Sequence, residues 1–156
     1  MINKLLISSN YSSRGGDRIK YIVIHDTANN RAGANGYNHY RYFNAAGRNA
    51  SCHYMVDSSG IIQLVEDFYS SWHCGDGRGR FGIKNSNSIG IEMCINSDGD
   101  WTKTKENTLV LVRYLLDKYT LNKEAVVRHF DASLKLCPRS MLEMGWREWT
   151  LFYSEI

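Results

Sequence analysis

The chain has 156 residues, the length of one ordinary domain, and its 43% hydrophobic and 22% charged residues are typical of a folded rather than a disordered protein. A net charge of +3 without a dense Lys/Arg stripe argues against nucleic acid as a partner. No apolar run approaches the roughly 18 residues of a membrane span, and the start lacks the apolar region of a signal peptide. We therefore expect no membrane partner, and synthesis in a cytoplasm or export by another route.

Hydrophobic patterns predict alternating strands and helices in the first half of the chain. The β-branched run 22–25 predicts a buried strand, followed by a polar, Gly-rich loop over 26–36. Aromatic residues at helical spacing predict a helix over 37–46. The apolar runs 53–56 and 61–65 flank an Asp-Ser-Ser-Gly sequence, which predicts a β-hairpin.

The second half begins with a long loop over 74–88, rich in Gly, Asn and Ser, and loops of this length in compact domains tend to be functional. A strand follows over 89–95, then a helix over 104–119 with a clear apolar stripe. Residues 125–129 form a short extended segment, and 140–153 a final helix. This order predicts a mixed α/β fold: a single domain with a central mixed β-sheet flanked by helices.

The four cysteines are not expected to form disulfides, because a chain of this size without a signal peptide normally keeps its thiols reduced. Cys52 and Cys94 lie within apolar strand patterns and are typical of small core residues. The sequence leaves the role of Cys74 open. Only Cys137, in a polar loop near a histidine, has the setting of a metal ligand.

Three residues far apart in sequence form a candidate metal site. His25 ends an apolar strand, His129 follows another extended segment, and Cys137 lies eight residues beyond His129. Two imidazoles and a thiolate suit Zn²⁺, and three protein ligands leave a fourth position open for water, as in catalytic sites. If they converge, in a surface groove at the strand ends, the protein is a hydrolase. For any single histidine the alternative is an ordinary hydrogen-bonded imidazole.

Two charged residues are candidates for catalysis beside this metal. Glu92 lies between Ile91 and Met93 in an apolar strand, where burial should raise its pKa and suit it to acid–base chemistry. The alternative is a half-exposed strand with Glu92 on its wet face. Lys135 lies between His129 and Cys137 in sequence, so a metal there would bring it close enough to stabilise an oxyanion. Its alternative is a solvated loop lysine.

The other histidines are less informative. His39 falls within the aromatic helix pattern and is expected to be a surface or packing residue. His53 begins a strand and His73 follows Trp72, and either position is compatible with lining a cleft.

Together these residues resemble the type-2 N-acetylmuramoyl-L-alanine amidases, the family shared by phage endolysins and peptidoglycan recognition proteins. The resemblance covers roughly residues 20–150, in the family's order. It rests on six segments: Tyr-Ile-Val-Ile-His-Asp-Thr (21–27), Ser-Cys-His-Tyr-Met-Val-Asp (51–57), Trp-His-Cys-Gly (72–75), Asn-Ser-Ile-Gly-Ile-Glu (87–92), Arg-His-Phe-Asp-Ala-Ser (128–133) and Lys-Leu-Cys-Pro (135–138).

The resemblance assigns a role to each candidate. It implies one Zn²⁺ per chain, with the zinc ligands His25, His129 and Cys137, the catalytic glutamate Glu92 and the basic residue Lys135 near the metal; His73 and Asn87 match positions that line the substrate groove. Some phage members carry a catalytic tyrosine where this chain has Cys52. The chain therefore resembles the glutamate-using branch.

The implied substrate is peptidoglycan, cut at the amide between N-acetylmuramic acid and the L-alanine of the muramyl peptide stem. A phage or prophage endolysin, acting as a monomer on the cell wall after release at lysis, fits the lack of a signal peptide. Endolysins usually carry a second, wall-binding domain, and none fits within 156 residues. The chain is therefore expected to be either the catalytic half of a longer protein or a free-standing amidase.

Three other functions compete with the amidase. A non-catalytic peptidoglycan-binding recognition domain would keep the groove but commonly lacks the metal cysteine, which this chain has. A zinc peptidase is disfavoured because no His-Glu-x-x-His sequence occurs. A structural zinc site would need a fourth ligand, and no other Cys or His lies near these three in sequence.

Overall fold

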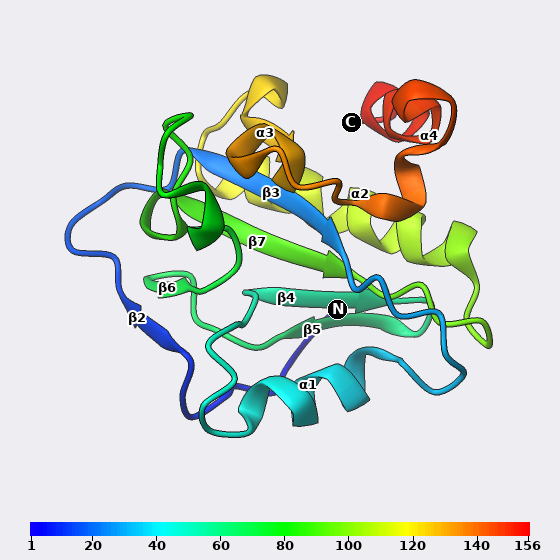
Figure 1. The fold of residues 1–156 in the computed structure, drawn as a ribbon, viewed down its shortest axis with the longest axis horizontal. Coiled ribbons are helices and arrows are strands. Elements are labelled where there is room, and N and C mark those ends of the chain that lie inside the picture. The colour runs from blue at the N-terminus through cyan, green and yellow to red at the C-terminus, as the bar shows by residue number, and fades with distance from the viewer.

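The computed structural model describes all 156 residues and shows one central six-stranded sheet with helices on both faces (Figure 1). A separate two-stranded sheet pairs β2 with β6. The central sheet has the order β1-β5-β4-β7-β3-β8. The strands are β1 (Ile2–Lys4), β2 (Tyr11–Ser13), β3 (Tyr21–Asp26), β4 (Tyr54–Asp57), β5 (Gly60–Gln63), β6 (Tyr69–Ser71), β7 (Ser88–Met93) and β8 (Val126–Arg128).

The central sheet is mixed, as the sequence predicts. Strands β4, β7, β3 and β8 run parallel to one another, β5 returns antiparallel to β4 as the predicted hairpin, and β1 pairs parallel with β5. The carboxyl ends of β3, β7 and β8 therefore lie at one edge of the sheet, which is where sites form in parallel sheets.

Two helices cover opposite faces of the sheet (Figure 1). Helix α1 (Gly36–Asn44) packs on β4 and β5 from one side, and α2 (Trp101–Lys118) packs on β4, β5 and β7 from the other. None of the helices is both long and apolar enough to cross a membrane. The α-helices are α1 (Gly36–Asn44), α2 (Trp101–Lys118), α3 (His129–Ser133) and α4 (Glu143–Ser154), and the short 3₁₀ turns are η1 (Gly75–Gly77), η2 (Asn85–Asn87), η3 (Lys123–Ala125) and η4 (Arg139–Met141).

Side-chain alternation along the strands decides what each face of the sheet does. On β7, Ile89, Ile91 and Met93 are fully buried in the main core, where they meet Leu109, Val112 and Leu115 of α2 with Trp149 and Phe152 of α4. Because successive strand residues point to opposite faces, Gly90 and Glu92 point to the other side. That side carries a smaller apolar cluster beneath α1 and, at the strand ends, the candidate site.

The predicted elements are present, with differences at their ends. The helix predicted over 104–119 begins earlier, at Trp101, because the Asp100 side chain accepts a hydrogen bond from the Lys103 backbone and caps it. The helix predicted over 140–153 begins only at Glu143, and Met144–Trp146 have left-handed backbone angles. Strands β1, β2 and β6 were not predicted, since three residues are too few to show alternation.

All four cysteines are buried, and none is bonded to another. Cys52 and Cys94 belong to the apolar cluster beneath α1, as expected. Cys74, whose role the sequence left open, packs with Val23 and Ile83 in a small third cluster.

A buried polar network holds the chain together away from the strand ends. The Asp67 carboxylate accepts hydrogen bonds from the hydroxyl of Tyr54 at 2.8 Å and from the ammonium of Lys118 at 2.7 Å. Nearby, the buried guanidinium of Arg14 donates to the backbone oxygens of Asp67, Ser86 and Ser88. These bonds join the N-terminal segment, the loop after β5 and α2.

Burial raises the pKa of Asp67, but hydrogen bonds from Lys118, Tyr119 and Tyr54 outweigh it and leave that pKa below its ordinary value. We therefore expect Asp67→Ala to lower the free energy of unfolding by about 3 kcal/mol at pH 7, since it leaves buried donors unpaired. Urea unfolding measures this change. The control is Asp117→Ala, because Asp117 lies on the solvent-exposed face of α2.

A depressed carboxyl pKa stabilises the fold above the unfolded-state pKa and loses that effect as the pH falls through the folded-state pKa. The difference between wild type and Asp67→Ala should accordingly shrink below about pH 4. Equal unfolding free energies for Asp67→Ala and Asp117→Ala at pH 7 would contradict the stabilising role of Asp67.

Candidate active site

His25 and Glu92 lie side by side because of the pairing between β3 and β7. These strands are parallel, and their register places His25 opposite Glu92. Both side chains point away from the main core, and Nδ1 of His25 is 4.0 Å from Oε1 of Glu92. The Glu92 side chain is only 18% exposed, so the alternative of an ordinary solvent-facing strand residue does not describe its setting.

His129 reaches the same place from the next strand. Strand β8 pairs with β3 on its other side and ends at Arg128, so His129 begins helix α3 at the sheet edge. Asp131 accepts hydrogen bonds from the backbone and the guanidinium of Arg128, which stabilises the first turn of α3. Helix α3 ends at Ser133, and the chain turns back at Leu134, which has left-handed backbone angles.

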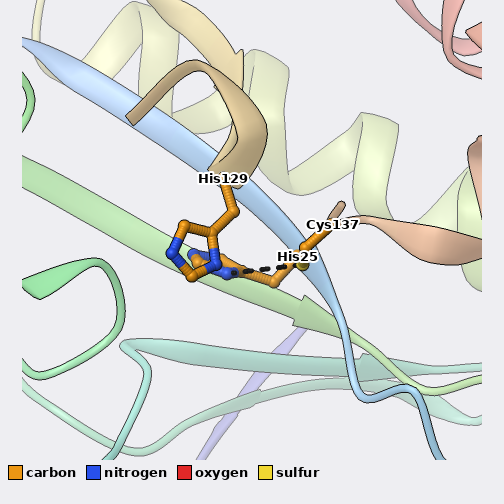
Figure 2. A group of neighbouring side chains, drawn as sticks. All are labelled: His25, His129 and Cys137. Carbon is orange, nitrogen blue, oxygen red and sulfur yellow. Dashed lines mark hydrogen bonds between the residues drawn. The ribbon is translucent and has the colours of Figure 1, made fainter. Parts of the chain in front are cut away.

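This return brings Cys137 to the two histidines. The Phe130 backbone donates a hydrogen bond to the Cys137 carbonyl at 3.0 Å, which closes the loop against α3. Figure 2 shows His25, His129 and Cys137 converging from β3, α3 and this loop. One ligand atom from each lies within 4.8 Å of the others, and the Cys137 sulfur is 3.8 Å from Nδ1 of His25. The sequence-predicted triad could therefore hold a metal ion.

The hydrogen bonding of the triad fits an ion at this position. Nδ1 of His129 is buried and has no hydrogen-bond partner, although buried polar atoms in proteins are nearly always paired. Oε2 of Glu92 is likewise buried and unpaired. The Nε2 atoms of both histidines do have hydrogen-bond partners: Nε2 of His25 bonds His73, and Nε2 of His129 bonds Asp76.

Burial keeps these groups uncharged. It lowers the pKa of His25 well below its ordinary value, helped by His73, His129 and Lys135, and it lowers the pKa of His129 despite the opposing hydrogen bond to Asp76. It also raises the pKa of the Cys137 thiol, as does nearby Glu92. Both imidazoles are therefore neutral near pH 7, the form that offers a lone pair to a metal.

Burial also raises the pKa of Glu92 well above its ordinary value; Asp26 adds to this effect and Lys135 opposes it. A carboxyl group with a raised pKa can take up and return a proton near neutral pH. Glu92 therefore has the electrostatic setting of a general base or acid, as the sequence predicts.

The site opens into a cavity of about 690 Å³. Lys135 lines it from the exposed loop between His129 and Cys137, and His73 lines it from the segment after β6. Asn87 does not line it: this residue is buried in the turn η2, where its amide bonds the backbone of Gly82 and Lys84. The cavity wall also includes Trp72, Tyr42, His39 and Arg139.

Two residues at the site, His39 and Asp76, are not identified by the sequence patterns. His39 lines the cavity, whereas the helical pattern pointed to a surface or packing role. Asp76 bonds His129 at 2.8 Å across 53 residues of sequence. The one available signal was its place within the long loop 74–88, which the sequence marked as functional.

Known proteins resemble this chain over most of its length. A family model described as N-acetylmuramoyl-L-alanine amidase matches residues 15–140. The N-acetylmuramoyl-L-alanine amidase CwlH of Bacillus subtilis (strain 168) is 37% identical over 136 residues, which cover 87% of this chain and 52% of CwlH. The amidase XlyA of the same organism is 38% identical over 123 residues, 79% of this chain and 40% of XlyA. The chain thus spans about half the length of the curated relatives it matches.

Solved structures agree with the sequence matches. The catalytic domain of XlyA superposes with a TM-score of 0.88 at 34% identity, covering 100% of this chain and 99% of that one. The structure of PlyL superposes with a TM-score of 0.83 at 29% identity, covering 99% and 96%. The matched residues 15–140 include His25, His129 and Cys137. The resemblance noted in the sequence is confirmed, and the chain belongs to the N-acetylmuramoyl-L-alanine amidase family.

Proposed function

We propose that this chain is the catalytic domain of a zinc-dependent peptidoglycan hydrolase that cleaves the amide between N-acetylmuramic acid and L-alanine. The observation that carries the proposal is the buried His25–His129–Cys137 cluster with Glu92 beside it, at the floor of an open cavity. Family membership supports the substrate class.

The donor set fits zinc. Zn²⁺ takes nitrogen and sulfur ligands, and the buried Nδ1 atom of His129, which has no hydrogen-bond partner, is available as a donor. His25, His129 and Cys137 would hold the ion and leave a position for water and substrate. When bound, zinc would supply Lewis acidity, which polarises the amide carbonyl and makes water a stronger nucleophile at neutral pH.

The chain's own residues move the protons. Glu92 is assigned to accept a proton from the attacking water at its carboxylate and to return it to the leaving amine of L-alanine. Its raised pKa suits both steps: the carboxylate is a stronger base than an ordinary one, and the protonated group is still acidic enough to give its proton to an amine. Lys135, on the cavity wall, would stabilise the negative charge that develops on the carbonyl oxygen.

The remaining candidates have unequal support as substrate contacts. His73 lines the cavity, but Asn87 does not, so we assign Asn87 to the architecture of the turn η2. A recognition domain that only binds peptidoglycan is disfavoured, because the chain retains three metal donors and Glu92. We further propose that the protein acts as a monomer on the bacterial cell wall after release at lysis.

Purified protein should contain about one zinc per chain and should release free L-alanine amino termini from peptidoglycan. A chelator should abolish this release, and added zinc should restore it. Elemental analysis and end-group analysis on one sample measure both. New termini other than L-alanine would indicate a peptidase, and wall binding without any product would indicate a recognition domain.

Glu92→Gln keeps the size of the side chain but removes the base, so turnover should fall at least about 100-fold while zinc content and thermal stability remain. The matched control is Glu106→Gln on the exposed face of α2, which should keep wild-type turnover. Near-full activity in Glu92→Gln would mean that another residue carries the proton.

Cys137→Ser should weaken zinc binding by more than about 100-fold. Loss of a residue that only hydrogen-bonds a metal-binding side chain already lowers metal affinity by about 10–100-fold. Competition with a chromophoric chelator measures the dissociation constant. Cys94→Ser makes the same change in the apolar cluster beneath α1 and should bind zinc as the wild type does. Unchanged affinity in Cys137→Ser would remove Cys137 from the metal ligands.

A further inference from the structure

Both histidines of the triad are held by one short segment, residues 73–76, that contains none of the three metal donors. Nε2 of His25 lies 2.9 Å from Nδ1 of His73, and Nε2 of His129 lies 2.8 Å from a carboxylate oxygen of Asp76. His73 and Asp76 are only three residues apart, between β6 and the end of η1. One segment therefore contacts two ligands, one from β3 and one from the start of α3.

The bond to Asp76 fixes the tautomer of His129. A carboxylate only accepts hydrogen bonds, so Nε2 of His129 carries the hydrogen and Nδ1 keeps its lone pair. The other carboxylate oxygen accepts from the hydroxyl of Ser133 at 3.0 Å, at the end of α3, which fixes the direction of Asp76. The nitrogen left with the lone pair is the buried Nδ1 that has no partner.

A chain of hydrogen bonds fixes His25 in the same way. The Lys84 carbonyl can only accept, so the Ser88 hydroxyl donates to it at 2.6 Å. The Ser88 oxygen then accepts from Nε2 of His73 at 3.0 Å, which leaves Nδ1 of His73 as the acceptor for Nε2 of His25. Nδ1 of His25 thus keeps its lone pair and faces the Cys137 sulfur.

The segment itself is held firmly. The side-chain oxygen of Asn85 accepts from the backbone of both His73 and Cys74, at 3.1 and 2.8 Å. The His73 ring lies directly on the backbone of β7 at Gly90, where a Cβ atom would come within 2.5 Å of the ring. His73 can neither shift toward the sheet nor turn away without breaking these contacts.

We propose that His73 and Asp76 are positioning residues: they hold His25 and His129 in the tautomer that presents Nδ1 to the metal, and thereby set its affinity. The inference rests on the proposed zinc-dependent function and gives His73 a role other than binding substrate. Hydrogen-bonded partners of ligating histidines commonly fix the tautomer and orientation of the ring and raise its basicity.

The test compares Asp76→Ala, His73→Ala and the conservative variants Asp76→Asn and His73→Gln, with Asp117→Ala as the control. Zinc affinity by chelator competition should fall about 10–100-fold in both alanine variants. It should recover partly in Asp76→Asn and His73→Gln, whose amide oxygens still accept a hydrogen bond. Asp117→Ala should match the wild type.

A second readout needs no zinc. In the metal-free protein, ¹⁵N NMR of the imidazole rings should show His129 with its hydrogen on Nε2 in the wild type and a tautomer mixture in Asp76→Ala. Unchanged zinc affinity together with an unchanged tautomer in Asp76→Ala would overturn the proposal. Because the Asp76 side chain is 48% exposed, we expect Asp76→Ala to fold, so the test stands even if His73→Ala does not fold.

The two proposals can fail separately. Wild-type protein that binds no zinc would refute the zinc-dependent function, while the tautomer shift in Asp76→Ala would still support positioning. Wild-type protein that binds zinc and cleaves peptidoglycan, with alanine variants of equal zinc affinity and the same tautomers, would refute positioning alone.

Discussion

The site depends on the parallel pairing of β3 with β7. Its register sets His25 beside Glu92, and the same alternation sends Ile24, Ile91 and Met93 into the main core. A shift of one residue in this pairing would turn a metal donor into the core and an isoleucine into the cavity. The apolar residues on one face of each strand therefore fix the geometry of the polar residues on the other.

The polar face gathers groups that burial keeps uncharged. The pKa values of His25 and His129 are lowered, and those of the Cys137 thiol and the Glu92 carboxyl are raised. A divalent cation would reverse this balance at the thiol, since a metal-binding cysteine is a thiolate and metal binding releases its proton. The unpaired atoms on His129 and Glu92 are consistent with a site whose electrostatics are completed by an ion.

Much of this arrangement could be predicted from the sequence, because each apolar strand pattern gives way to polar residues where the strand ends. His25 and His129 each follow an apolar run, and parallel strand ends meet at one edge of a sheet, so a convergent site with Cys137 followed. Glu92 stood out as a carboxylate within an apolar strand. The part that could not be predicted depends on long-range contact: nothing in the sequence pairs Asp76 with His129, and the helical pattern of His39 does not reveal that its helix lies beside the cavity.

The buried guanidinium of Arg14 bears on where this domain can be cut. The family model begins at residue 15, one position after Arg14. Arg14 is only 8% exposed, and its side chain donates to the backbone oxygens of Asp67, Ser86 and Ser88, which lie far from it in sequence. A truncation drawn at the family boundary would leave those carbonyls unpaired in the interior, next to the segment that carries Ser88. The N-terminal segment up to Arg14 is thus part of the packed domain, although the family model does not include it.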